Sequence, residues 1–360
     1  MELFTCTPRA PETGAGAGGA AVRARGRTRV VDIHCHLSVP EADALVAAQR
    51  PQGGFADSFS SALTREVNRT QFQGIAAKLA SLEARLADMD RMGVDVQAVS
   101  PSPGQYHYWA PPELGRELAR LVNDRIAEAV GRHPGRFVGL GTVPLQAPAL
   151  AVEELRRAVR ELGLRGIEIS SNVEGRELAD PEFRPFFAAA EELGTLIFLH
   201  PLGFTHGERL SEHYFNNVIG NPLESTIAIG HLIFGGVLER HPGLKICVAH
   251  GGGYLPTYIG RMDHVFAARA DGRQNITKPP SHWLRKLYFD TVMFDSDQLR
   301  WVVEKYGADH VLLGTDFPFD MAEEDPVGFV STLPDEVRER VLGGNAAALL
   351  GLGAAAASGR

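Results

Sequence analysis

The feature that most constrains this chain of 360 residues is a regular alternation of short apolar runs with amphipathic stretches. Near-continuous apolar runs predict parallel strands buried on both faces, and the amphipathic stretches between them predict covering helices. The expected strands lie at residues 30–35, 94–100, 137–143, 166–170, 196–200, 245–250, 287–292 and 311–316. The expected helices lie at residues 75–92, 112–132, 150–162, 181–193, 224–240, 255–269, 296–306 and 336–350.

Eight strand–helix units are the number that closes an α/β fold of the (β/α)8 TIM-barrel type. An open doubly wound sheet is the alternative, but no Gly-x-Gly-x-x-Gly follows the first strand to suggest a nucleotide fold. We therefore expect one barrel domain over residues 29–352. Long inserts at about 38–74 and 202–222 follow strands one and five, so we expect both at the mouth of the barrel, where such folds build their sites.

Composition excludes several classes of function. A net charge of −8 argues against a nucleic-acid-binding surface, and no apolar run is long enough to span a membrane. The three cysteines show no paired spacing, which favours a reducing compartment and a cytoplasmic protein. Residues 1–28, rich in Ala, Gly and Pro, are expected to form a disordered arm, and residues 353–360 a flexible tail.

Polar side chains stand where several of the expected strands end. Strand one ends in His34-x-His36, and both histidines face the same way because strand side chains alternate between faces. Strands five, six and eight end at His200, His250 and Asp316. An isolated His-x-His is a weak signal that a solvent-facing strand end also produces. Five such groups converging on one barrel mouth predict a shared metal site.

Three histidines and an aspartate suit one borderline divalent metal with an open position for water. Zinc is the expected ion, and manganese is bound by the same ligand types. Strand four reads Gly166-Ile-Glu-Ile-Ser170 and has no lysine to bridge two ions, which favours a single metal. The role of Glu168 stays open, and a polar residue inside the barrel is its ordinary interpretation.

Several motifs resemble the amidohydrolase superfamily and, within it, the branch of 2-amino-3-carboxymuconate-6-semialdehyde decarboxylase. The resemblance covers about residues 30–352. It rests on Val31-Asp-Ile-His-Cys-His36, Tyr108-Trp-Ala-Pro111, the stretch from Arg136 to Pro148, His200-Pro201, Phe234-Gly-Gly-Val237, His250-Gly-Gly-Gly253 through Ile259-Gly-Arg261, and Leu313-Gly-Thr-Asp-Phe-Pro318.

The resemblance implies a set of roles for these residues. The metal ligands would be His34, His36, His200 and Asp316, with Asp316 also counted as catalytic. His250 would activate the metal-bound water and shuttle a proton, and Arg261 would enter the partner subunit's site in a homodimer to bind the substrate carboxylate. The expected substrate contacts are Arg261, Trp109, Asn217 and Phe317.

The chain departs from the branch around the substrate. Leu202 and Asn217 replace two active-site tryptophans of the branch, so the pocket is expected to offer more amide and less indole. The second carboxylate-binding arginine of the branch falls near Gln73 in this sequence, and Arg65 and Arg69 are the nearby substitutes.

The leading hypothesis is a metal-dependent, non-oxidative decarboxylase of a small unsaturated or aromatic carboxylic acid. Hydrolysis of a lactone, amide or ester, or hydration of a double bond, are the alternatives on the same barrel. A non-catalytic binding protein is the weakest candidate, because a complete ligand set with an open position has little purpose without chemistry.

Overall fold

The computed structural model describes residues 28–47 and 59–353. The predicted arm and tail lie almost wholly outside the described residues, as do residues 48–58 of the first insert. Eight parallel strands stand in the order of the sequence: β1 (Val31–Leu37), β2 (Val96–Pro101), β3 (Phe137–Gly141), β4 (Gly166–Ile169), β7 (Leu196–Leu199), β8 (Lys245–Val248), β9 (Tyr288–Asp290) and β10 (Val311–Leu312). Each overlaps one of the eight predicted strands.

The two ends of this sheet meet. The amide nitrogen of Ile33 donates to the carbonyl oxygen of Leu313 at 2.9 Å, and the amide of Asp316 donates to the carbonyl of His34 at 2.8 Å. Cys35 forms a further parallel bridge with Phe317. These contacts join β1 to the chain that continues β10, which confirms the predicted barrel and excludes the open sheet.

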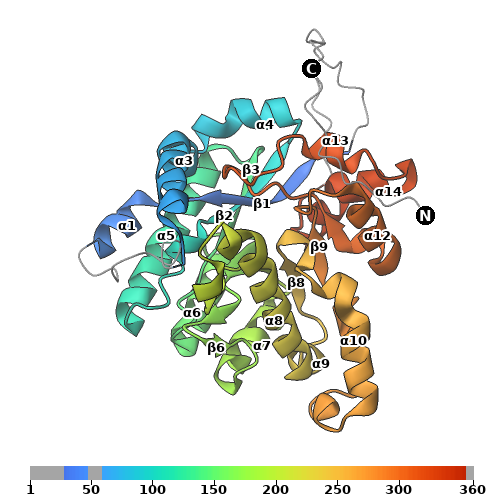
Figure 1. Ribbon diagram of the computed structural model, residues 1–360. Helices are drawn as coiled ribbons and strands as arrows, with labels where there is room; N and C mark the ends of the chain where they lie inside the picture. Colours follow the sequence, from blue (N-terminus) through green and yellow to red (C-terminus); the bar gives the residue numbers. More distant parts are fainter. Residues whose placement is uncertain (1–27, 48–58, 354–360) are drawn as a thin grey trace.

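Helices surround the strands, as Figure 1 shows. Two of the helices, α4 and α7, end at glycines in left-handed conformations, Gly93 at φ 71° and Gly194 at φ 60°. The helices are α1 (Pro40–Val46), α3 (Ala62–Ala80), α4 (Leu86–Met92), α5 (Pro112–Arg132), α6 (Pro148–Arg160), α7 (Arg184–Leu193), α8 (Asn221–Phe234), α9 (Val237–Arg240), α10 (Leu255–Ala268), α11 (Pro280–Leu284), α12 (Ser296–Tyr306), α13 (Pro326–Val330), α14 (Asp335–Glu339) and α15 (Asn345–Leu349).

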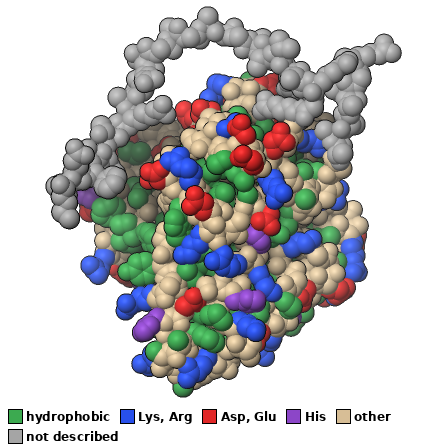
Figure 2. Space-filling view, turned by 90° about the vertical axis from the view of Figure 1, so that its right-hand side faces the viewer, with side chains coloured by type: hydrophobic (Ala, Val, Ile, Leu, Met, Phe, Trp, Pro, Cys, Tyr) green, Lys and Arg blue, Asp and Glu red, His purple; other side chains and the backbone are tan. Residues whose placement is uncertain are grey.

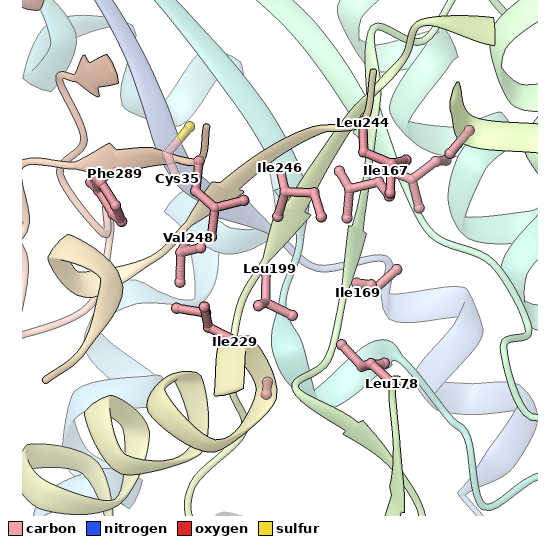
Figure 3. Packing of buried hydrophobic residues seen from close by; sticks show 14 of the residues in the cluster. Cys35, Ile167, Ile169, Leu178, Leu199, Ile229, Leu244, Ile246, Val248 and Phe289 are labelled. Carbon is pink, nitrogen blue, oxygen red and sulfur yellow. The ribbon is translucent and has the colours of Figure 1, made fainter. Parts of the chain in front are cut away.

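The buried strand residues divide into an inner and an outer cluster. Along β7, Phe198 belongs to the inner cluster and Leu199 to the outer one, because successive side chains face opposite sides of a strand. The outer cluster packs the sheet against the helices, and Figure 3 shows Leu199 and Val248 beside Ile229 of α8. Each fully buried aliphatic side chain of this kind contributes about 1.5–3 kcal/mol relative to exposure.

A β-bulge reverses the side-chain alternation within β1. The register with β2 shifts between Asp32 and Cys35. Val31 before the shift and Ile33 within it belong to the inner cluster, whereas Cys35 after the shift belongs to the outer one. His34 and His36 therefore both face the interior at the mouth. Bulges are common beside active sites because they re-aim side chains in this way.

The inserts and two helices differ from the sequence expectation. The first insert contains α1 and most of α3, which begins after Ser61, whose side chain accepts a hydrogen bond from the Thr64 amide. The predicted helix at 75–92 is therefore not one helix: its residues belong to the end of α3 and to α4. The predicted helix at 336–350 is divided into α14 and α15 by a π-helical turn, Arg340–Gly344. Gly343 in this turn has non-helical backbone angles, and a Cβ at this position would collide with the carbonyl oxygen of Arg29.

The surface shows no large block of one charge on the face in Figure 2, where acidic and basic side chains are interspersed. Among the described residues, no helix combines the length and the apolar character needed to cross a bilayer.

We predict that Gly343→Ala destabilises the protein, because a Cβ at this position would collide with the carbonyl oxygen of Arg29. Overpacking of this kind costs about 1–3 kcal/mol, measurable as a lower midpoint of thermal unfolding. Gly131→Ala in α5 is the control, since its Cβ would meet nothing within 4 Å and alanine favours a helix. Equal midpoints for the Gly343→Ala variant and the wild type would contradict this assignment.

Candidate metal centre

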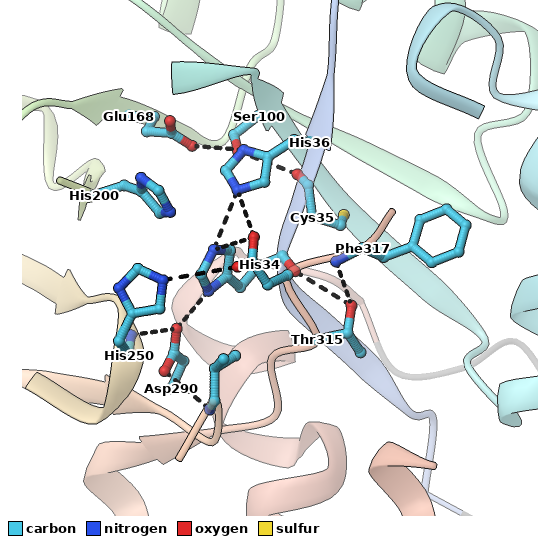
Figure 4. A network of polar contacts seen from close by, with 12 residues as sticks. His34, Cys35, His36, Ser100, Glu168, His200, His250, Asp290, Thr315 and Phe317 are labelled. Carbon is cyan, nitrogen blue, oxygen red and sulfur yellow. Dashed lines mark hydrogen bonds and ion pairs between the residues drawn. The ribbon is translucent and has the colours of Figure 1, made fainter. Parts of the chain in front are cut away.

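Four of the residues predicted at strand ends meet at the mouth of the barrel. His34 and His36 come from β1, His200 follows β7, and Asp316 follows β10. One ligand atom from each lies within 4.8 Å of the others, and all four residues are buried. Figure 4 shows the rings of His34, His36 and His200 gathered around one centre.

Hydrogen bonds orient the two β1 histidines for a shared ion. Nδ1 of His34 lies 2.6 Å from Oδ2 of Asp290, and Nδ1 of His36 lies 3.1 Å from the carbonyl oxygen of Pro101. The two Nε2 atoms therefore face each other at 3.1 Å, and Oδ1 of Asp316 lies 3.3 and 3.2 Å from them. Metal-ligating histidines typically donate their other ring nitrogen to a carboxylate or carbonyl in this way.

Buried negative charge surrounds the same point. Asp32, Glu168, Asp290 and Asp316 are all buried, whereas Arg85 is the one buried Lys or Arg side chain among the residues that the structure describes. Isolated buried carboxylates are costly unless a positive charge or hydrogen bonds compensate them. The donor set and this excess of negative charge both favour a cation.

The pKa values of His34 and Asp316 also indicate that this site favours positive charge. Burial alone would lower the pKa of His34, but the charges and hydrogen bonds of Asp316 and Asp290 outweigh it and raise the pKa to about 10. Burial alone would raise the pKa of Asp316, but His34 and hydrogen bonds from His250, His34 and His36 hold it well below its usual value. The carboxylates thus stabilise positive charge between them.

His200, the fourth residue of the cluster, also has the properties of a metal ligand. Burial, together with the positive charges of His36, His34 and His250, holds its pKa well below the usual value, so its imidazole is neutral. Neither ring nitrogen of His200 has a hydrogen-bond partner among the residues that the structure describes, although the residue is buried. A divalent ion binds such ligands at about 2.0–2.2 Å, so ligand atoms within about 4.4 Å of one another are required. Small shifts of these side chains meet that requirement, and the site is a divalent metal centre.

His250 lies beside the ligand set rather than within it. It follows β8 in a left-handed conformation with φ 55°, and its Nε2 is 3.8 Å from Oδ2 of Asp316. Its ring centre is 5.3 Å from that of His34 and 5.0 Å from that of His200. This position places Nε2 of His250 next to the four clustered residues without making it one of them.

Sequence reasoning missed the carboxylates that support the ligands. Asp32 accepts hydrogen bonds from the His34 amide at 3.1 Å and the Thr315 hydroxyl at 2.7 Å. Asp290 ends β9, but it lies inside the strand expected at residues 287–292 and not at its end, so the sequence pattern did not distinguish it.

Glu168, whose role the sequence left open, is a buried support for the centre. Its Oε1 accepts the Tyr106 hydroxyl at 2.5 Å, and its Oε2 lies 3.7 Å from Nδ1 of His36. Burial raises its pKa. This position agrees with the ordinary interpretation of a polar residue inside the barrel.

A cavity of about 1590 Å³ opens from the centre toward solvent. His200 and Asp316 lie at its floor, and the two inserts supply much of its wall. Trp109 and Asn217, two of the expected substrate contacts, line it, as do Arg65 and Arg69. Arg69 is paired with Glu66 at 2.5 Å.

Two of the expected substrate contacts, Phe317 and Arg261, are not among the residues that line this cavity. Phe317 does not line the cavity, because it follows Asp316 on the opposite face and its ring packs against Arg85, with 5.3 Å between the guanidinium and the ring centre. Phe319 lines the cavity instead, 5.4 Å from the His36 ring. Arg261 is exposed on α10 and does not line the cavity of its own chain, and Gln73 is exposed on α3.

Comparison with known proteins agrees with this architecture. A family model described as Amidohydrolase matches residues 31–352. A 2-amino-3-carboxymuconate-6-semialdehyde decarboxylase from Dictyostelium discoideum is 36% identical over 334 residues, which cover 91% of this chain and 92% of that protein. A gamma-resorcylate decarboxylase from Rhodococcus jostii (strain RHA1) is 28% identical over 275 residues, with 70% and 82% covered.

Among solved structures, that of 5-carboxyvanillate decarboxylase from Sphingomonas paucimobilis is similar with a TM-score of 0.80 and 28% sequence identity. The match covers 90% of this chain and 99% of that chain.

We predict that His36→Ala and Asp316→Ala each weaken metal binding by about tenfold or more, because each removes one ligand atom from a set of four. Bound metal is measured by atomic spectroscopy after dialysis against metal-free buffer. His133→Ala, which removes a half-buried histidine paired with Glu83, is the matched control and is expected to retain its metal. Unchanged metal stoichiometry in the first two variants would remove them from the ligand set.

Proposed function

The chain belongs to the amidohydrolase family, and we propose that it is a metal-dependent carboxy-lyase that removes CO₂ from an unsaturated or aromatic carboxylic acid. The observation that carries this proposal is the position of His250, 3.8 Å from Asp316 and outside the ligand set, above which a large cavity opens. Similarity to decarboxylases in both sequence and fold supports it.

The reaction exchanges a carboxylate for a proton at one carbon. His34, His36, His200 and Asp316 would hold a divalent metal, which would supply Lewis-acid chemistry at a substrate oxygen. When the bond to the carboxylate carbon breaks, CO₂ leaves and its electron pair stays on the substrate carbon. Nε2 of His250 then delivers a proton to that carbon, a role that requires a nitrogen beside the reacting centre.

The buried walls of the site assist by excluding water from it. Phe198 of the inner cluster is fully buried with its ring centre 5.0 Å from that of His34, and the ligand side chains themselves are nearly inaccessible. Charges in such a water-poor environment interact more strongly than in bulk water, so fixed groups stabilise developing charge effectively.

The cavity walls suggest how a substrate is held. Trp109 and Phe319 offer aromatic faces, whereas Asn217 and Asn172 offer amide groups. We propose that the aromatic side chains pack against a planar substrate and that the amides bind its polar substituents. Arg65, which donates to the carbonyl oxygen of Ser60 and lines the cavity, is a candidate partner for the substrate carboxylate.

We propose zinc as the metal, since three imidazoles and a carboxylate are typical zinc ligands, with manganese as the alternative that the same ligands accept. A cytoplasmic location is supported by Cys35 and Cys247, which are buried and unpaired.

A homodimer is proposed from an apolar patch beside Arg261. The patch consists of Val218, Tyr254 and Tyr258, with 48%, 40% and 65% of their surfaces exposed. The hydroxyl of Tyr254 reaches the carbonyl oxygen of Ile219 at 3.4 Å, so the second insert and α10 adjoin there. Exposed aromatic clusters are typical of protein interfaces. A partner on this patch would receive Arg261 at its own mouth.

We predict that the metal-loaded protein releases CO₂ from its substrate and that, in D₂O, one solvent deuteron is bound to the carbon that lost the carboxylate. Aromatic and muconate-type acids are the compounds to test, by mass spectrometry of the products. Incorporation of ¹⁸O from labelled water without CO₂ release would contradict decarboxylation and indicate hydrolysis or hydration.

His250→Asn is expected to retain its metal and to lose about 10²–10⁴-fold in kcat, because it removes the proton donor.

We predict that Arg261→Ala and His250→Asn complement each other. In a mixed dimer, the subunit with intact His250 would receive intact Arg261 from its partner, so one of the two sites would be complete. Random exchange between equal amounts of the inactive variants is then expected to restore about a quarter of wild-type activity. Absence of recovery despite exchange, followed by native mass spectrometry, would contradict a shared site.

A further inference from the structure

Asp290 is surrounded by hydrogen-bond donors. Its Oδ2 lies 2.6 Å from Nδ1 of His34 and accepts the His250 amide at 3.1 Å. Its Oδ1 accepts the amides of Gly251 at 2.8 Å and Val292 at 3.1 Å. The residue is fully buried, and Figure 4 shows it between the ring of His34 and the backbone at His250. One carboxylate thus contacts a metal ligand and the proton-transfer residue.

Only an ionised carboxylate satisfies these neighbours. Three of the four groups are backbone N–H donors that cannot change roles, and a carboxylate is the side chain that only accepts. With both oxygens accepting, Nδ1 of His34 must carry the proton, which leaves the lone pair of its Nε2 for the metal. An amide at the same position would instead direct its NH₂ group at donors on one side or the other.

The same carboxylate also shapes the turn that carries His250. Four successive residues, His250 to Gly253, have positive φ angles of 55°, 63°, 82° and 66°. Successive amides in such a turn form a concave anion-binding surface, and Asp290 fills it by accepting the first two of these amides. Histidine rarely adopts this backbone conformation, so an outside contact has to hold it there.

We propose that Asp290 is a positioning residue that fixes two active-site groups at once. It sets the tautomer of His34 for metal binding, and it holds the backbone that places His250 beside the centre. The first role concerns the metal alone, whereas the second rests on the proposed function. The two roles predict separate effects on metal affinity and on turnover.

Asp290→Asn tests the proposal, because it keeps the shape of the side chain and changes one acceptor into a donor. Affinity for Zn²⁺ alone, measured by competition with a chromophoric chelator, is expected to fall by about 10–100-fold. At saturating zinc, kcat is expected to fall by about tenfold or more while KM stays within about twofold, because His250 is misplaced. A change in the visible spectrum of the Co²⁺-loaded variant would report the altered ligand.

The matched control is Glu154→Gln. Glu154 is also buried and accepts from Asn123 at 2.6 Å and Arg157 at 2.8 Å, but it lies on α6, where it contacts Asn123 of α5, outside the site. Wild-type zinc affinity in Glu154→Gln, combined with weakened affinity in Asp290→Asn, supports the proposal. Zinc affinity within twofold of wild type in Asp290→Asn, or an equal loss in both variants, would overturn it.

A measurement on the zinc-loaded wild type keeps the proposal testable where Asp290→Asn does not fold. Nitrogen-15 NMR is expected to show a protonated Nδ1 on His34, with a strongly downfield proton absent from His34→Gln. Coordination of zinc through Nδ1 of His34 would overturn the proposal. Because zinc affinity and tautomer are measured without substrate, a protein that binds zinc but releases no CO₂ would refute the proposed function and leave this role of Asp290 intact.

Discussion

The burial of several carboxylates around one point is the constraint on which the rest of the structure depends. Asp32, Asp290, Asp316 and Glu168 converge near the mouth, and Arg85 is the buried guanidinium that accompanies them in the described part of the chain. Each carboxylate removed from water loses hydration that only a charge or hydrogen bonds can replace. The histidines, the strand-end amides and the metal are those replacements, so the same groups that perform the chemistry also make the interior tolerable. Folding and metal binding are therefore thermodynamically linked, since a bound ion stabilises the folded state.

The closure of the barrel makes this convergence possible. Asp316 comes from the last strand unit and His34 from the first, yet the Asp316 amide bonds directly to the His34 carbonyl at 2.8 Å. The ligands that contact each other are thus joined through backbone as well as through side chains, at the seam of the ring. The substrate cavity has a different origin, because its walls come largely from the two inserts. A rigid seam for the metal and separate walls for the substrate allow specificity to vary without disturbing the centre.

The amino-acid sequence predicts the scaffold and the ligand set well, because both depend on simple patterns. Continuous apolar runs identify the strands, and His34-x-His36, His200 and Asp316 stand at or near the ends of three of them. Local patterns fail where distant chain segments decide the outcome. The periodicity of residues 336–350 gives no sign of the non-helical backbone at Gly343, where the chain approaches the Arg29 carbonyl oxygen too closely for a Cβ. Alternation alone indicates that Phe317, next to Asp316, faces the other way, but a motif match suggested a substrate contact. Asp290 is an ordinary acid in the sequence, and only the folded chain brings donors to all sides of it.

The bulge in β1 divides that strand into two half-strands of opposite phase. The first half places Ile33 in the inner apolar cluster of the barrel, and the second half directs His34 and His36 into the polar mouth. A regular strand cannot do both, because residues of odd and even number face opposite sides along its whole length. The extra residue therefore lets the same strand contribute apolar side chains to the barrel interior and polar side chains to its mouth. Loss of one residue here would turn His34 and His36 toward the helices while leaving the inner cluster in place. The length of this short segment therefore matters as much as its composition.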